Sequence, residues 1–202
     1  MNSTTHWDAV YAARATEDLG WYEPRPSTLG LVLRFSEPSD AVIDIGSGDS
    51  RTADELVHAG YADITILDLS RTALDRVRSR LGPAAREVTS IEADVTLWQP
   101  PRHWDLWHDR AVFHFLVDAD GRDAYKATAL RALAGDGRLV IATFAVDGPE
   151  QCADLPVERY DHESLAAFFE PEFRLVEHRD MRAEPAGAGD TRPYVAAVLE
   201  RR

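Results

Sequence analysis

The sequence predicts an α/β protein built on a doubly wound sheet of seven strands, mostly parallel with an antiparallel last strand. Short apolar runs alternate with helical patterns between residues 42 and 144, and each such step adds a parallel strand. The run at 42–45 ends in an acid and a glycine-rich turn, which is typical of a buried strand entering a ligand-binding loop. Two late stretches, 173–182 and 194–201, flank a loop at 184–190 and predict a closing antiparallel pair. The predicted sheet is therefore Rossmann-like.

Length and composition favour one domain over residues 1–202, with an N-terminal helical segment at 1–35 and the sheet core at 40–202. The net charge of −13 argues against nucleic acid and against an anionic membrane as partners. A single cysteine excludes an intrachain disulfide and a multi-cysteine metal site. With no signal-like start and no span of membrane length, we expect a cytoplasmic monomer or homodimer.

The N-terminal segment is rich in aromatic residues. Trp7 and Tyr11 are four residues apart and share one face of a predicted helix, and Trp21 and Tyr22 precede a proline in a predicted turn. These rings either pack as core or form a lid whose faces line a substrate pocket.

Residues 42–50, VIDIGSGDS, form the predicted strand and loop around which the chain is organised. Gly46 and Gly48 allow a sharp turn and a close approach to a ligand. A helix follows from Thr52 toward Gly60, with Asp49 or Ser50 as its cap. Arg51 occupies the position where a dinucleotide-binding loop needs a small residue, and no Lys-Ser/Thr pair follows as in a phosphate-binding P-loop.

The loop residues Asp44, Gly46, Ser47 and Gly48 resemble motif I of the class I S-adenosylmethionine-dependent methyltransferases, with Ser50 in place of the third glycine. The resemblance implies that this loop binds the methionine end of the cofactor, S-adenosyl-L-methionine. It also implies an acid after the next strand that binds the ribose hydroxyls.

Asp68 matches that acid, since it ends the apolar run 64–67 and lies 20 residues after Gly48, with Leu69 beside it. A carboxylate can accept from both vicinal hydroxyls. The alternative is that Asp68 caps the predicted helix 71–81. The next strand, 88–93, leads to Asp94 and Val95, which the resemblance assigns to the adenine amino group and ring; Asp94 as an ordinary turn residue is the alternative.

The fourth strand, 104–110, brings His108, Asp109 and Arg110 to the ligand edge of the sheet. We predict His108, Asp109 and His114 as catalytic, with His108 or His114 as a general base and His108 also touching the cofactor. Hydrogen-bonded structural histidines are the alternative. A metal site at His103, Asp105, His108 and Asp109 is rejected because strand alternation divides these side chains between two faces.

The later elements complete the prediction. Asp120 is expected to cap a helix to about Ala134, stopped by glycines 135 and 137, before a buried strand at 138–144. A long connection without regular structure is predicted at 147–160, then a helix at 162–169 capped by Asp161 and a late loop at 184–190. The predicted substrate-binding residues are Trp7, Tyr11, Trp21, Tyr22, Arg110, His114, Phe144, Cys152 and Tyr160.

The resemblance implies methyl transfer from S-adenosylmethionine. A single domain of 202 residues, without an extra module to bind a macromolecule, favours a small-molecule acceptor. The W-D-x-x-Y and W-Y pairs resemble a branch of small methyltransferases that includes relatives of the elongation-factor lysine methyltransferases, so a protein lysine acceptor is one alternative. Another is a cofactor-binding protein that is non-catalytic or catalyses a different displacement, such as intramolecular cyclisation. Residues 182–187, RAEPAG, depart from the His-Thr-Pro-x-Gly segment of many small relatives, which leaves the acceptor open.

Overall fold

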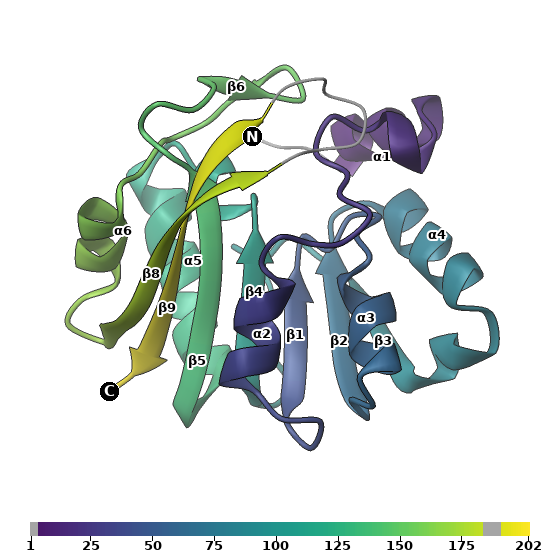
Figure 1. Cartoon of the computed structure of the whole chain (residues 1–202), viewed down its shortest axis with the longest axis horizontal. Coiled ribbons are helices and arrows are strands. Elements are labelled where there is room, and N and C mark those ends of the chain that lie inside the picture. Colours follow the sequence, from purple (N-terminus) through teal and green to yellow (C-terminus); the bar gives the residue numbers. More distant parts are fainter. Residues whose placement is uncertain (1–3, 184–190) are drawn as a thin grey trace.

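The computed structural model describes residues 4–183 and 191–202. The predicted late loop at 184–190 lies outside the described residues. Within them the main sheet has seven strands in the order β3-β2-β1-β4-β5-β9-β8 (Figure 1). These strands are β1 Ala41–Ile45, β2 Asp63–Asp68, β3 Val88–Glu92, β4 Trp104–Arg110, β5 Leu133–Phe144, β8 Phe173–Ala183 and β9 Arg192–Arg201.

Strands β1 to β5 pair in parallel, and β9 pairs antiparallel with both β5 and β8. The predicted doubly wound sheet with an antiparallel last strand is confirmed. The switch in strand order lies between β1 and β4, where a crevice opens beyond the carboxyl ends of the strands.

Helices cover both faces of the sheet. They are α1 Thr4–Ala13, α2 Leu29–Phe35, α3 Thr52–His58, α4 Arg71–Leu81, α5 Ala119–Ala132 and α6 His162–Phe169. Apolar residues of α2, α3 and α4 pack in one core cluster with one face of the sheet, and those of α5 and α6 pack in a second cluster with the other face. Figure 1 shows α1 beyond the edge where β1, β2 and β4 end.

Helix α4 illustrates how the sequence pattern sets the packing. Leu74 and Val77 are buried at helical spacing, whereas Arg78 is exposed, and Ser70 caps the helix by accepting from the Ala73 backbone N–H. A turn of 3-10 helix, η2 Gly82–Glu87, joins α4 to β3 and was not expected from the pattern.

Two predictions about α5 are wrong. Asp118, not Asp120, caps the helix by accepting from the Gly121 N–H at 2.7 Å. The helix ends at Ala132, and the chain enters β5 directly at Leu133, which pairs with Trp104. The expected glycine stop therefore lies inside β5, where the pairing with β4 shifts register after Trp104.

The connection at 147–160 also differs from the prediction, because it contains a short antiparallel pair, β6 Gln151–Cys152 and β7 Leu155–Pro156. Asp161 caps α6 as predicted, in a reciprocal capping box with Ser164. Among the described residues, no helix combines the length and apolar character needed to cross a membrane.

Candidate active site

A cavity of about 450 Å³ is lined by residues at the carboxyl ends of β1, β2 and β4 and by residues of the N-terminal segment. Its walls combine a glycine-rich loop, carboxylates at strand ends and aromatic rings. Of the residues predicted for the site, the lining includes Asp44, Gly46, Ser47, Gly48, Asp68, Leu69, Asp94, Val95, His108, Arg110, Trp7, Tyr11, Trp21, Tyr22 and Cys152. The structure thus brings predicted cofactor-binding residues and predicted substrate-binding residues together around one cavity.

The loop after β1 requires glycine at two positions. Gly46 and Gly48 have φ angles of 56° and 52°, a region that L side chains rarely adopt. A Cβ on Gly46 would lie 2.0 Å from a Val112 methyl carbon, and one on Gly48 would lie 2.3 Å from the Tyr11 hydroxyl oxygen. The loop is therefore packed closely against both the core and the N-terminal segment.

Asp68 is buried at the end of β2 and is joined to this loop. One carboxylate oxygen accepts the Gly48 N–H at 2.7 Å, and the other accepts the Ser70 N–H at 2.7 Å. Burial, reinforced by the nearby Asp44 charge, raises the pKa of Asp68 to about 6, although the two backbone bonds oppose this. The cap of α4 is Ser70, so Asp68 is not needed for that role.

Asp94 and Val95 follow β3 at the same edge. Asp94 Oδ1 accepts from the backbone and hydroxyl of Thr96, at 2.8 and 2.6 Å, which fixes the turn in which the carboxylate stands. Asp94 therefore has the turn role considered as the alternative, and it also lines the cavity beside the buried Val95.

Asp44 and His108 are register partners on β1 and β4, and their side chains meet beside the loop. His108 Nδ1 lies 2.7 Å from Asp44 Oδ1, and Nε2 lies 2.8 Å from the Thr28 hydroxyl. Both ring nitrogens are thus engaged, and the histidine is buried. This arrangement holds Asp44 in place and matches the structural alternative for His108 better than a free general base.

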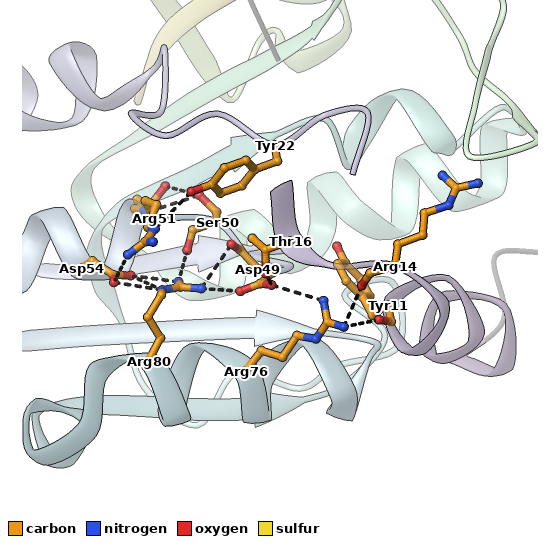
Figure 2. Close-up of polar contacts among 11 residues, drawn as sticks. Tyr11, Arg14, Thr16, Tyr22, Asp49, Ser50, Arg51, Asp54, Arg76 and Arg80 are labelled. Atoms are coloured by element: carbon orange, nitrogen blue, oxygen red, sulfur yellow. Dashed lines mark hydrogen bonds and ion pairs between the residues drawn. The ribbon is translucent and has the colours of Figure 1, made fainter. Parts of the chain in front are cut away.

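A network of ion pairs and hydrogen bonds connects the glycine loop to α4 and to the N-terminal segment (Figure 2). Asp49 forms ion pairs with Arg76 and Arg80 of α4 and accepts from the Thr16 hydroxyl. Arg80 also bonds Asp54 and the Ser50 carbonyl, while Arg76 donates to the Tyr11 carbonyl at 2.5 Å. The loop, α4 and the N-terminal segment are thereby held as one unit.

Asp49 is therefore an anchor rather than the predicted helix cap. Ser50 serves the start of α3, because its hydroxyl accepts the Thr52 N–H at 3.1 Å.

Four predicted residues do not line the cavity. The Asp109 carboxylate accepts from the Tyr125 hydroxyl and from the backbone of Val112 and Phe113, so it fixes the turn after β4, and burial raises its pKa to about 6. The other three are His114, Phe144 and Tyr160, all buried behind the wall.

His114 packs against Phe144, with ring centroids 4.7 Å apart, and its Nδ1 accepts the Phe144 N–H at 3.3 Å. Burial and the Arg110 charge lower the pKa of His114 to about 3, so the ring is neutral near pH 7. The placement corrects the expectation that His114, Phe144 and Tyr160 face the substrate, because each fills the core with its ring.

The aromatic residues of the N-terminal segment form part of the cavity wall. Trp7 contacts Trp21 and Phe115 edge to face, at centroid distances of 6.0 and 5.2 Å, and Tyr11 contacts Trp21 at 6.2 Å. The Tyr22 hydroxyl instead accepts from Arg51 at 3.3 Å. These rings pack on each other, and Trp7, Tyr11, Trp21 and Tyr22 also line the cavity.

Glu23 and Asp49 are two of the cavity residues that sequence reasoning did not assign to the site. Glu23 is buried beside Arg110, and Asp49 was considered only as a helix cap. The signal for Glu23 was an acid within an aromatic and proline-bounded segment, Trp21 to Pro24. For Asp49 the signal required knowing that Arg76 and Arg80 of a later helix face the loop.

Among the described residues no group of acidic, histidine or cysteine side chains could hold a metal ion.

Comparison with known proteins points in one direction. Residues 42–137 match the methyltransferase domain family. The eEF1A lysine and N-terminal methyltransferase of Danio rerio is 25% identical over 163 residues, which cover 78% of this chain but 22% of that protein. The chain thus spans about a fifth of the length of this curated relative.

Solved structures share the fold. A structure from work on conversion of a disulfide bond into a thioacetal group during echinomycin biosynthesis has a TM-score of 0.75 and 23% identity, covering 98% of this chain and 92% of that one. The Burkholderia thailandensis 1,6-didemethyltoxoflavin-N1-methyltransferase, solved with 1,6-didemethyltoxoflavin and S-adenosylhomocysteine, has a TM-score of 0.67 and 21% identity, covering 95% and 80%.

The strand order, the glycine loop with its flanking acids and the match over residues 42–137 lead to one assignment. Residues 42–137 carry a methyltransferase domain, and the chain has the Rossmann-like fold with an antiparallel last strand that its sequence motifs predict.

Proposed function

We propose that the cavity binds S-adenosylmethionine between the glycine loop and the N-terminal segment, and that the protein transfers the methyl group to a small-molecule acceptor. The observation that carries this proposal is the link between Gly48 and Asp68, which places a buried carboxylate directly beside a loop that only glycine can form. A nucleoside with vicinal hydroxyls fits such a site, because the carboxylate has lone pairs left to accept from both.

Unpartnered polar atoms support the fit of this cofactor. Asp44 Oδ2 and Ser47 Oγ are buried, belong to cavity-lining residues and have no hydrogen-bond partner among the described residues. Buried polar groups are rarely left unsatisfied in a native structure, so a ligand with donor groups is expected beside them. A carboxylate beside the loop also favours a cationic ligand, and the bound cofactor would supply an electrophilic methyl group on a sulfonium.

Each end of the cofactor has a candidate partner in this chain. Asp68 would accept from the ribose hydroxyls and Asp94 from the adenine amino group, with Val95 packing on the ring. Asp44 and Ser47 would bind the methionine end, and His108 would hold Asp44 in position through its 2.7 Å contact. These roles are the ones that the family resemblance implies, and the donors and acceptors that line the cavity support them.

The acceptor end supports catalysis by positioning. Trp7, Trp21 and Phe115 enclose the space, and orientation with exclusion of water can supply roughly 7 to 11 kcal/mol at best. Both ring nitrogens of His108 are engaged, and His114 lies behind the wall, so neither is presented as a free base. We propose that residues 1–35 form a lid over bound ligands. Methyl transfer from the cofactor would depend chiefly on positioning of the acceptor, and any proton acceptor would be secondary.

Protein lysine methylation is the second candidate, because the curated relative named above methylates lysine according to its name. Residues of the N-terminal segment line the cavity, which favours a small acceptor instead. We further propose a cytoplasmic monomer or homodimer that binds no nucleic acid, in keeping with the net charge of −13.

The test is a screen of small molecules and of elongation-factor protein with S-adenosylmethionine, following release of S-adenosylhomocysteine. Release that depends on a small acceptor supports the proposal, and release that depends on the protein substrate favours the lysine alternative. Methylthioadenosine as product would indicate intramolecular cyclisation. Saturable binding without any product would indicate a non-catalytic binding protein.

A further inference from the structure

A buried ion pair borders the acceptor end of the cavity. Arg110, at the end of β4, places its Nε 3.8 Å from Glu23 Oε2, and the two side chains are 9% and 5% exposed. Both residues line the cavity together with Trp7, Trp21 and Cys152. One member of the pair belongs to the sheet and the other to the N-terminal segment, so the pair exists only where that segment is seated.

Some polar atoms of this ion pair are hydrogen-bonded to the backbone, and others have no partner among the described residues. Glu23 Oε2 accepts the Ser27 N–H at 2.8 Å, and Arg110 Nη2 donates to the Trp21 carbonyl at 2.9 Å. Glu23 Oε1 and Arg110 Nη1 are buried and have no partner among the described residues. One acceptor and one donor are therefore left over, and unsatisfied buried groups of this kind point to a ligand.

Charge restricts which ligand can satisfy both. Glu23 and Arg110 neutralise each other, so an added anion or cation would bring an uncompensated charge into a buried space. A neutral group with a donor next to an acceptor satisfies both atoms and leaves the balance intact. Cys152 does not alter this balance, because burial raises the pKa of its thiol.

We propose that Glu23 and Arg110 select the methyl acceptor by binding a neutral edge in which an N–H or O–H lies next to a carbonyl, as in a lactam or carboxamide. The N–H would donate to Glu23 Oε1, and the carbonyl would accept from Arg110 Nη1. The two residues are specificity determinants for the acceptor, and the inference rests on the proposed function because it places the acceptor beside the cofactor space.

The experiment uses the full chain saturated with S-adenosylhomocysteine and measures dissociation constants of four small probes by calorimetry. 2-Pyridone carries the neutral donor–acceptor edge, N-methyl-2-pyridone lacks the donor, and benzoate and benzylamine carry single charges. We expect 2-pyridone to bind at least about tenfold more tightly than each of the others, the ratio for one buried hydrogen bond lost.

Glu23→Gln tests the charge argument. This variant leaves the Arg110 charge unbalanced, so the preference should shift from 2-pyridone toward benzoate by about tenfold or more. Glu17→Gln, which changes an exposed residue of the same N-terminal segment, should keep the wild-type order. If Glu23→Gln does not fold, the comparison of 2-pyridone with its N-methyl form in the wild type decides the question.

Different results would contradict the proposed function and the role of Glu23 and Arg110. A wild-type protein that does not bind S-adenosylhomocysteine contradicts the proposed function itself. Normal S-adenosylhomocysteine binding combined with equal affinity for the four probes, or with no 2-pyridone binding at millimolar concentration, overturns only the role of Glu23 and Arg110. An unchanged probe order in folded Glu23→Gln overturns it as well.

Discussion

Asp68 accepts the Gly48 backbone N–H at 2.7 Å, so the acid at the end of β2 and the glycine loop after β1 form one hydrogen-bonded unit. A second bond from Ser70 fixes the other carboxylate oxygen. The carboxylate is thus oriented before any ligand arrives, which reduces the entropy lost on binding.

The first prediction concerns this carboxylate. Asp68→Ala should weaken S-adenosylhomocysteine binding by roughly 2 to 3 kcal/mol, because charge-assisted bonds to the ribose are left unmade. Asp75→Ala, at an exposed position of the following helix, is the matched control and should leave the dissociation constant unchanged. Calorimetric titration of both variants checks this, and equal affinities for the two would exclude Asp68 as a ligand contact.

The second prediction concerns pH. The pKa of Asp68 rises from an ordinary value of 3.8 to about 6 through burial, so the folded state holds this proton more tightly than the unfolded state. The contribution of this group to the free energy of unfolding is fully present below 3.8 and is lost as pH rises through about 6.

Urea unfolding of wild type and Asp68→Asn should show this directly. The difference in unfolding free energy should shift in favour of the variant as pH rises from about 4 to about 8. Affinity for S-adenosylhomocysteine should show the opposite trend in the wild type, rising through the same interval as the carboxylate ionises. A difference in stability that is independent of pH would contradict the assigned burial of the charge.

The third prediction separates backbone strain from close packing. Gly48 and Gly60 both have positive φ, but a Cβ on Gly48 meets the Tyr11 hydroxyl at 2.3 Å, whereas one on Gly60 meets nothing within 4 Å. Gly60→Ala should cost roughly 1 to 2 kcal/mol of strain and keep ligand binding. Gly48→Ala should lose more stability and also lose S-adenosylhomocysteine binding, as measured by thermal unfolding and calorimetry. Two variants with the same behaviour would contradict a special role for the loop.

The fourth prediction concerns the anchoring network. Arg80→Ala removes one partner from the buried Asp49 carboxylate, which keeps Arg76 and Thr16, and should reduce the free energy of unfolding by about 1 to 3 kcal/mol. Arg78→Ala, at an exposed position of the same helix, should change it little. Urea denaturation of both variants makes the comparison, and similar losses would mean that the network adds no stability.

The fold was predictable because its signals are local. The apolar run before Gly46, the acid after the second run and the periodicity of α4 each follow from neighbouring residues. The errors lie where distant contacts decide the outcome. Leu133 enters β5 because it pairs with Trp104, and this pairing overrides the helix stop that glycines 135 and 137 suggest.

Residues of the candidate site were predictable where the ends of parallel strands converge. They were less predictable where a side chain could either line the cavity or pack into the core. Asp68 and Asp94 reach the cavity because Asp68 ends one parallel strand and Asp94 closely follows another. His114 and Phe144 leave it because they pack against each other behind the wall. The pairing of Glu23 with Arg110 joins residues that lie far apart in the sequence, and no sequence pattern connects them.

The central claim is that this cavity binds the cofactor, and a calorimetric titration of the wild-type protein with S-adenosylhomocysteine tests it most directly. We predict a saturable isotherm with one site per chain, because the described cavity is lined by one glycine loop, which is hydrogen-bonded to the Asp68 carboxylate. No measurable binding at millimolar ligand, with the protein folded, would contradict the account.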